Sequence, residues 1–149
     1  MIKAVAIETY KLAKTDIQLI KATLESLNVN KNVENISSNL IHDFNFGVRM
    51  EFVDEERRYA YLRTIIDSRS EESGEVHLEI ETVHKGVFKS TVLLDEETFN
   101  NFVDVQIVPQ LLPYARTLIS NLTTEMGIKS IILPTMDIIN SIMENSESE

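Results

Sequence analysis

A change in the spacing of apolar residues limits the fold of this chain more than any other feature. In residues 43–52, DFNFGVRMEF, every second residue is apolar, which is the pattern of a β-strand with one buried face. From Ile107 to Met126 the apolar residues recur at intervals of three and four, which is the pattern of an amphipathic helix. The order of the two patterns predicts an α+β chain whose strands precede its main helix.

Two more strands are predicted after the first. Residues 58–68 are rich in aromatic and β-branched side chains, and apolar residues alternate with polar ones in residues 76–88. The links between these segments, residues 54–57 and 69–75, are short and polar. Because short links join neighbouring strands, we expect an antiparallel meander.

The first 30 residues fit two different patterns. Their apolar residues can be placed on one side of a helix, but four of them also share one face of a strand: Ile17, Leu19, Leu27 and Val29. We expect a short helix over residues 3–14 and a strand over about 18–29. One longer helix is the alternative, and periodicity alone favours it.

The main helix is expected over roughly residues 108–126, ending at Gly127. Pro109 suits the first turn of a helix, whereas Pro113 removes one internal hydrogen bond and is expected to bend it. The apolar stripe of this helix is wide, so we expect part of it to be buried between subunits. Thr135 can cap a second, short helix with four apolar residues: Ile138, Ile139, Ile142 and Met143.

The composition excludes several classes of function. The net charge is −10, from 14 basic and 24 acidic residues, which argues against binding to nucleic acid or to anionic membranes, because both need a basic face. No apolar run approaches the ~20 residues of a membrane-spanning helix, and the N-terminus lacks the pattern of a signal peptide. The sequence contains no cysteine for disulfides or thiol catalysis. We therefore expect a soluble, cytoplasmic protein with no membrane insertion.

Few residues are arranged for catalysis. His42 and Asp43 are neighbours, but neighbours on a strand point to opposite faces. His77, Glu79 and Glu81 share one strand face, where they either present a ladder of metal ligands or are simply solvated. The sequence has no motif for a nucleophilic serine, a phosphate-binding loop or a zinc protease. We expect no enzyme activity, metal or cofactor, and we rank a metal-binding or small-molecule-binding domain last among the functions considered.

The linker between the two expected C-terminal helices, residues 126–136, is unusually apolar. Connections are commonly polar and exposed, so this one must either cover the core or leave an apolar surface for a partner. Arg116, near the start of the expected main helix, has two interpretations. It binds an anionic ligand or lies in an interface, or it is partly buried, bonded to carbonyls or a carboxylate and stacked on Tyr114 or another aromatic residue, which the sequence favours.

Three segments together resemble the SecB family of cytosolic protein-export chaperones. They are KGVF at residues 85–88, VPQLLPYARTLISNL at 108–122 and GIKSIILPTMDI at 127–138. The second segment keeps the family's Pro-x-Leu-x-Pro-Tyr-Ala-Arg pattern, with different residues where Cys, Phe and Glu are usual: Val108, Leu112 and Thr117. The third keeps the glycine and the Leu-Pro pair, but has Met-Asp-Ile where Ile-Asn-Phe is usual. The resemblance covers roughly residues 19–142.

The resemblance implies a fold and a mode of binding. The fold is a four-stranded antiparallel sheet with two C-terminal helices packed on one face, to which this chain adds a short N-terminal helix. Members of the family form homotetramers built as dimers of dimers. They hold unfolded polypeptides in apolar grooves along the helices and the loop between them, without nucleotide or metal.

The resemblance also implies roles for individual residues. Eight are expected to bind client polypeptides: Phe44, Phe46, Met126, Ile128, Ile131, Ile132, Leu133 and Met136. Six are expected at the start of the main helix and in the subunit interface: Pro113, Tyr114, Arg116, Leu118, Ile119 and Leu122. Glu79 and Glu81 are expected to contact the translocase motor SecA.

Two chaperone functions follow from this resemblance. The first is an ATP-independent holdase that keeps non-native polypeptides competent for export. The alternative is a dedicated chaperone of a single partner, such as an antitoxin or a phage protein. The N-terminal extension, residues 1–16, resembles that of SecB-like chaperones in toxin–antitoxin systems. We expect the SecB-like domain to span residues 17–143 and a disordered acidic tail to occupy residues 144–149.

Overall fold

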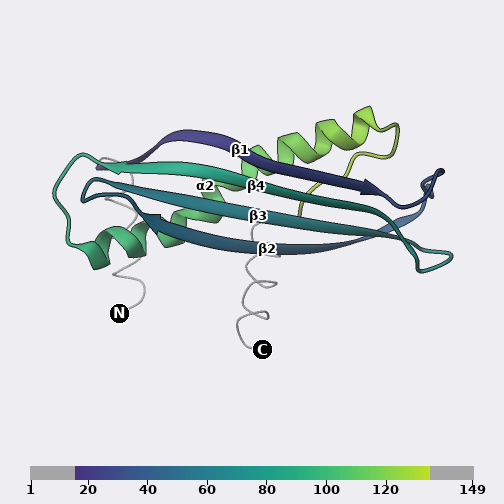
Figure 1. The fold of residues 1–149 in the computed structure, drawn as a ribbon, viewed down its shortest axis with the longest axis horizontal. Coiled ribbons are helices and arrows are strands. Elements are labelled where there is room, and N and C mark those ends of the chain that lie inside the picture. Colours follow the sequence, from purple (N-terminus) through teal and green to yellow (C-terminus); the bar gives the residue numbers. More distant parts are fainter. Residues whose placement is uncertain (1–15, 135–149) are drawn as a thin grey trace.

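The computed structural model describes residues 16–134 and shows one antiparallel sheet with a helix packed against it (Figure 1). The elements are β1 (Ile17–Lys31), β2 (Leu40–Phe52), β3 (Arg57–Ser70), β4 (Val76–Ser90) and α2 (Glu96–Glu125). The α+β class and the four-stranded sheet are therefore confirmed. Within residues 16–134, α2 is the one helix. The expected second C-terminal helix, the N-terminal helix and the acidic tail lie outside the described residues.

The strands lie in the order β1-β4-β3-β2, and each neighbouring pair is antiparallel. The meander expected for the middle of the chain is confirmed in β2, β3 and β4. β1 does not lie beside β2, because it pairs with β4 at the opposite edge of the sheet. The chain therefore crosses the end of the sheet through residues 32–39, which we call the crossover loop.

Two β-bulges explain why the sequence of β1 fits a helix as well as a strand. The pairing register shifts between Leu19 and Lys21, and again between Leu24 and Ser26. Each bulge adds a residue to β1, so residues on the face toward α2, the inner face, are spaced by two and three positions in turn. They are Ile17, Leu19, Ala22, Leu24, Leu27 and Val29. The strand expected over residues 18–29 is confirmed, and the longer helix is wrong.

Helix α2 begins at Glu96, well before the expected start near residue 108. Asp95 caps it, because the Asp95 carboxylate accepts a hydrogen bond from the Thr98 N–H at 3.1 Å. Glu96 and Glu97 add negative charge at the positive end of the helix dipole. The predicted helix start was therefore wrong, and the segment assigned to it lies in the middle of α2: Pro113, Tyr114, Arg116 and Leu118.

Pro109 and Pro113 are tolerated inside α2 because both lie on its exposed side. A proline has no N–H for the carbonyl four residues before it, so the carbonyls of Val105 and Pro109 lose their helical partners. Val105 is 61% exposed and Pro109 is exposed, so water can solvate both carbonyls. The prolines therefore do not mark the start of the helix.

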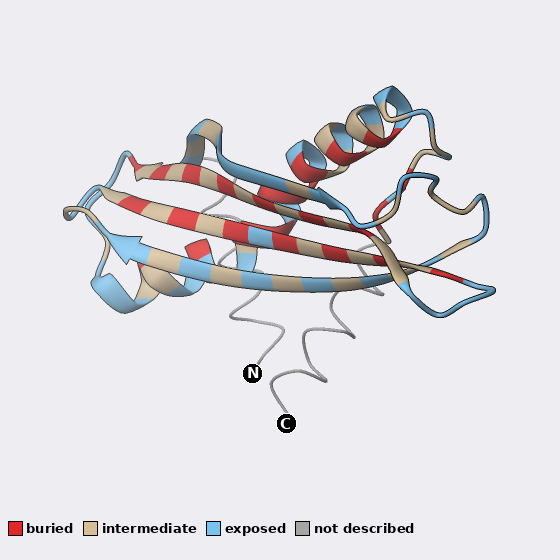
Figure 2. Cartoon of the chain, turned by 45° about the vertical axis from the view of Figure 1, so that its right-hand side comes forward, coloured by how far each residue is buried: buried red, intermediate tan, exposed pale blue. Residues whose placement is uncertain are grey.

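The core lies between α2 and the two central strands (Figure 2). In β3 and β4, buried residues alternate with half-buried ones along most of each strand, whereas the edge strands β1 and β2 are more exposed. α2 crosses the inner face diagonally and contacts mainly β3 and β4. Its buried stripe starts at Phe99: Phe99, Phe102, Val103, Ile107, Val108, Leu111, Leu112, Ala115, Ile119 and Thr123.

Gly86 lies where α2 and β1 approach β4 closely. A β-carbon at this position would lie 2.9 Å from Leu19 Cδ1 and 3.0 Å from Leu111 Cδ2, so both leucines would have to move. Gly86→Val is expected to lower the free energy of unfolding by about 2 kcal/mol, as overpacking of a core does. Gly86→Ala should lower it less, because the leucine ends are flexible. Urea denaturation measures both, and a valine variant as stable as the wild type would contradict this packing.

Candidate functional site

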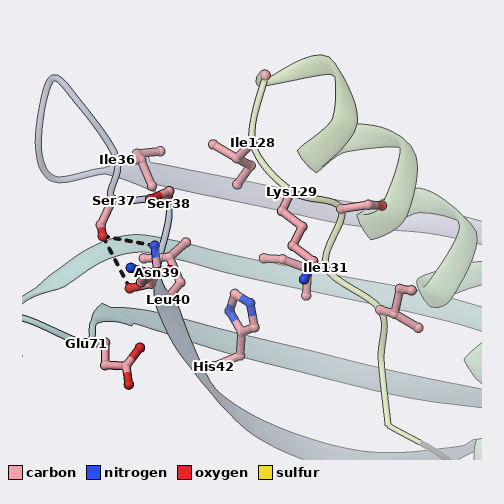
Figure 3. Close-up of a pocket in the computed structure, with 13 residues that line it drawn as sticks. Ile36, Ser37, Ser38, Asn39, Leu40, His42, Glu71, Ile128, Lys129 and Ile131 are labelled. Atoms are coloured by element: carbon pink, nitrogen blue, oxygen red, sulfur yellow. Dashed lines mark hydrogen bonds between the residues drawn. The ribbon is translucent and has the colours of Figure 1, made fainter.

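A groove opens where the crossover loop faces the chain that follows α2 (Figure 3). Its volume is about 580 Å³. One side is formed by residues 36–40, with His42 and Glu71, and the other by residues 127–132. The second side belongs to the apolar linker, of which the structure describes residues 126–134. The groove therefore joins two segments that are far apart in the sequence.

Hydrogen bonds fix the crossover loop to the end of β3 and the start of β4. The Asn32 N–H donates to the His77 carbonyl at 2.9 Å, and the Ser37 N–H donates to His77 Nδ1 at 3.1 Å. At the far end of the loop, the Glu71 N–H donates to the Asn39 carbonyl at 3.0 Å. His77 therefore has a structural role, because it holds one wall of the groove in place.

The opposite wall begins with a glycine that turns the chain back after α2. Gly127 has a φ of 76°, a conformation that favours glycine. The Gly127 N–H donates to the Thr124 carbonyl, and the Ile128 N–H donates to the Thr123 carbonyl. This pairing is a Schellman motif, which ends a helix and reverses the chain. The helix end predicted at Gly127 is confirmed.

Hydroxyl groups of α2 hold the linker against the helix. Thr123 is fully buried, and its Oγ1 accepts a hydrogen bond from the Ile131 N–H at 3.0 Å. One turn earlier, Ser120 Oγ lies 2.8 Å from Ser130 Oγ. These bonds satisfy linker groups that would otherwise be buried without partners. They also fix the position of the linker relative to the helix.

Arg116 holds the end of the described linker. Its Nη2 donates to the Pro134 carbonyl at 3.2 Å, and its side chain is half-buried. The predicted bond of a partly buried guanidinium to a carbonyl is confirmed, whereas its stacking on Tyr114 stays a prediction. Arg116 therefore helps to hold the linker, which forms one wall of the groove, against α2.

Apolar side chains line both sides of the groove. Ile36 and Leu40 are half-buried on the loop side, and Ile128 is half-buried on the linker side. Ile132 is 71% exposed, although a side chain of this size is normally buried. Lys129 is exposed beside it on the linker. Such a groove suits the apolar side chains of an extended polypeptide.

Of the residues predicted to bind clients, Ile128, Ile131 and Ile132 line the groove. Ile131 is only 1% exposed and Leu133 only 3%, so both side chains belong to the core of the single chain. Side chains in the linker thus alternate, with Ile131 and Leu133 pointing inward and Ile132 outward. Ile132 is the apolar linker residue most available to a ligand.

The other predicted client-binding residues do not line the groove. Phe44 and Phe46 lie on the inner face of β2 and are half-buried against the core, as is Met126 after α2. Met136 lies outside the described residues. A client-binding role for these residues stays a prediction.

The loop side of the groove was not predicted from the sequence. Ile36 and Leu40 flank a short polar segment, and nothing in their spacing shows that the chain crosses the sheet there. The one available signal was the pair of aliphatic residues Val33 and Ile36 in the polar segment NKNVENISSN. Such a pair is too weak a pattern to place a loop against a distant linker.

His42 lies beside the groove on the inner face, with its Nδ1 2.7 Å from Ser68 Oγ. Burial lowers the pKa of His42, and the nearby Asp43 carboxylate partly opposes that shift. Asp43 itself lies on the other face of the sheet, which we call the outer face, and forms an ion pair with Arg69 at 2.8 Å. The two neighbours thus point to opposite faces, as predicted, and do not form an acid–base pair.

The expected ladder of His77, Glu79 and Glu81 does lie on one face of β4, but each residue has its own partner. Asn32 Nδ2 donates to Glu79 Oε2 at 3.2 Å, and Arg63 Nε donates to Glu81 Oε1 at 2.8 Å. Within residues 16–134 no group of three or more acidic or histidine side chains is placed to hold a metal ion.

The residues predicted for the subunit interface differ in exposure. Ile119 is fully buried beneath α2, so it belongs to the core of the single chain. Tyr114 is 48% exposed, and Leu118 and Leu122 are half-buried. Pro113 is exposed. A subunit interface through these residues stays a prediction. Among the described helices, none is long and apolar enough to cross a membrane.

Stability is expected to fall as the pH is lowered below about 6.5. His84 is 4% exposed, its Nδ1 has no hydrogen-bond partner in the described part of the chain, and burial lowers its pKa from the ordinary 6.5. The unfolded chain therefore binds more protons than the folded one in this range, and protonation favours unfolding. Burial also lowers the pKa of His42, so protonation of His42 favours unfolding as well.

His84→Leu tests this pH dependence, because leucine fills the site without a titrating group. Urea denaturation between pH 7.5 and 5.5 should show a shallower loss of stability for the variant than for the wild type. Equal slopes for the two proteins would show that His84 does not contribute.

The four-stranded sheet with a helix across its inner face is the fold of a SecB-like chaperone of known structure, as the sequence motifs predicted. The solved structure of the SecB-like chaperone Rv1957 from Mycobacterium tuberculosis matches with a TM-score of 0.72 at 12% sequence identity. The match covers 87% of this chain and 96% of that chain, which was solved with a ChAD peptide from the HigA1 antitoxin. No family model and no curated protein matches the sequence. The likeness is therefore one of fold.

Proposed function

We propose that this protein is an ATP-independent chaperone that binds non-native polypeptide in the groove between the crossover loop and the linker. The observation that carries the proposal is the exposure of Ile132 beside a groove whose two walls are both held by hydrogen bonds. An exposed isoleucine next to other apolar residues of a groove can bury its side chain against a ligand. The proposed activity needs no metal, cofactor or catalysis.

The dimensions of the groove support a polypeptide ligand. A volume of about 580 Å³ accommodates a few side chains rather than a folded domain. The lining is mixed, because isoleucine and leucine side chains offer an apolar surface, whereas serine, asparagine and charged side chains can form hydrogen bonds with a polypeptide backbone. The net charge of −10 favours clients with basic segments and limits self-association. The peptide bound to the similar M. tuberculosis chaperone also supports polypeptide as the ligand.

Suppression of aggregation tests the proposal. A chemically denatured test protein is diluted into buffer with the chaperone in stoichiometric excess and without ATP, and light scattering is followed. We expect scattering to be suppressed. Unchanged scattering for several unrelated test proteins and for the dedicated partner described next would refute chaperone activity.

A dedicated chaperone of one partner is the second candidate, and the antitoxin peptide in the similar structure favours it. The two candidates differ in client range. A general holdase protects unrelated denatured proteins, whereas a dedicated chaperone protects one partner encoded beside it and fails on the rest. The same scattering assay, run with the neighbouring gene products, separates them.

Export and assembly are further parts of the proposal. Glu79 and Glu81 lie on the outer face of the sheet, away from the groove, where the motor SecA can contact them while a client is bound. The exposed side of α2, with Val105 at 61% and Tyr114 at 48%, supports a homotetramer built through the helices. In this proposal the protein acts in the cytoplasm. Sedimentation velocity tests the tetramer, and a stable monomer at micromolar concentration would contradict it.

A further inference from the structure

A second apolar surface lies at the end of the sheet opposite the groove. A pocket of about 500 Å³ opens there between the turn that joins β2 to β3 and the chain that joins β4 to α2. Phe52 and Leu93 line it and are 59% and 82% exposed, and Val92, which precedes Leu93, is 41% exposed. Large apolar side chains exposed together indicate a surface that packs against another segment. We call these three residues, with the pocket, the end patch.

Acidic side chains surround the end patch. Glu55, Asp95 and Glu96 line the pocket, and Glu97 lines the hollow beside it. Across residues 16–134 none of these four forms an ion pair. The one basic residue that lines the pocket, Arg58, is 2% exposed and donates its hydrogen bonds to groups of the protein itself. A segment that packs against the end patch should therefore be apolar and positively charged.

The first residues of the chain have the composition that the end patch requires. Residues 1–15, MIKAVAIETYKLAKT, lie outside the described residues and contain three lysines but one acidic residue, Glu8. Most of the others are apolar, among them Ile2, Val5, Ile7 and Leu12. The stretch is therefore basic and apolar, in a chain whose net charge is −10.

This stretch is attached to the fold beside the end patch. Asp16 is the first described residue, and its carbonyl accepts hydrogen bonds from the Thr91 N–H at 2.8 Å and from Thr91 Oγ1 at 3.2 Å. Thr91 comes directly before Val92 and Leu93. The start of β1, the connection from β4 to α2 and the start of α2 lie at the same end of the sheet in Figure 1. A segment joined to its binding surface by a short stretch of chain has an effective concentration on the order of millimolar, so weak contacts are enough to hold it.

We propose that residues 1–15 pack against the end patch of the same chain, with their lysines beside its acidic side chains. The segment covers apolar surface outside the groove, so unfolded polypeptide is confined to the groove, a consequence that rests on the proposed function. The groove is a poor alternative site for the segment. It lies at the far end of a sheet about 50 Å long, from the 15 residues of β4 at ~3.3 Å each, and 15 residues reach that far only when fully extended.

Cysteine cross-linking tests this packing, because the chain has no cysteine of its own. Ala4→Cys, far along the segment, is combined with Asn101→Cys, which is exposed on α2 beside the end patch. A short bismaleimide should join the two cysteines in high yield, and mass spectrometry of the digested protein identifies the link. Mixing the two single-cysteine variants should give little cross-linked dimer, because the link forms within one chain.

Two further pairs decide between the end patch and other positions of the segment. Lys89→Cys lies opposite Gln18 near the start of β1, but on the outer face, and Lys129→Cys lies in the groove. Each should give little product with Ala4→Cys. Equal yields at Asn101 and Lys89, a stronger link to Lys129, a dimer as abundant as the internal link, or no link at any position would overturn the proposal.

Charge reversal tests the attraction between the lysines and the acidic side chains. Glu55→Lys should lower the rate of cross-linking between Ala4→Cys and Asn101→Cys about twofold to fivefold, as the loss of exposed ion pairs does. Glu55 is exposed and, unlike the other three acidic residues, is not part of the start of α2. Glu72→Lys, exposed in the turn between β3 and β4 at the other end of the sheet, is the matched control. Equal rates for the two variants would contradict the proposal. The assay contains no client, so its failure would leave the proposed function untouched.

Discussion

Ile132→Asp is expected to weaken the binding of an unfolded polypeptide by tenfold to a hundredfold, with little change in the free energy of unfolding. Ile132 is 71% exposed and lines the groove, so its side chain contributes little to the core. Burying an isoleucine against a ligand contributes about 1.5–3 kcal/mol, and each 1.4 kcal/mol is a factor of about ten in affinity. An aspartate at this position would also lose solvation when a client binds.

Leu93→Asp is the matched control for that variant. Leu93 is 82% exposed, but it follows β4 at the opposite end of the sheet and does not line the groove. Fluorescence anisotropy of a labelled, permanently unfolded test protein measures both affinities. Equal weakening by the two substitutions would show that any exposed apolar residue binds clients. If Ile132→Asp did not weaken binding, the linker side of the groove would be excluded as the client-binding surface.

Arg58→Ala is expected to have the largest effect on stability, a loss of about 3 kcal/mol and roughly 10 °C in Tm. Arg58 is 2% exposed. Its Nε donates to Asn100 Oδ1 at 2.7 Å, and its guanidinium carbon lies 4.4 Å from the centre of the Phe99 ring on α2 and 4.6 Å from that of Phe52 on β2. The side chain therefore joins the first turns of α2 to the edge of the sheet.

The loss of stability in Arg58→Ala follows from the hydrogen-bond acceptors that the substitution leaves without a donor. Asn100 and the Asp54 carbonyl would lose their donor in a half-buried site, where each such group costs about 1 kcal/mol, and the cavity left under the Phe99 ring adds to the loss. Arg58→Lys should recover less than half, because an ammonium cannot stack as a plane between two rings. Arg49→Ala is the control: Arg49 also stacks on a tyrosine, but its side chain is 63% exposed. Thermal denaturation in which both alanine variants lost equal stability would contradict this account.

The strands could be predicted because the alternation of apolar and polar residues along a strand can be read from a short stretch of sequence. Residues 43–51 alternate between exposed and half-buried along β2, as their sequence pattern indicated, and only Phe52 at the strand end departs from it. The β1 strand fitted two patterns because the bulges after Leu19 and Leu24 changed the period of its inner face. A bulge depends on the register with β4, far along the chain, so no local pattern could reveal it.

The start of α2 was missed because two local signals disagreed. Phe99, Phe102 and Val103 have helical spacing and Asp95 is a good cap, but Pro109 and Pro113 resemble a helix start. Only the tertiary structure shows that both prolines lie on the solvent side, where their missing hydrogen bonds matter least. The crossover loop had no periodic pattern at all. The loop side of the groove could therefore not be predicted from the sequence. Its linker side was predicted, because an apolar connection between two helices is unusual.

The central claim is that unfolded polypeptide binds between the crossover loop and the linker. A photo-crosslinking amino acid at Lys129, exposed in the groove wall, tests it most directly, with the same amino acid at Leu93 as the control. After irradiation with a permanently unfolded test protein or the dedicated partner, we predict a strong covalent product from position 129 that excess unlabelled client removes, and little product from position 93. Equal capture at both positions, or none at 129 with either ligand, would contradict the claim.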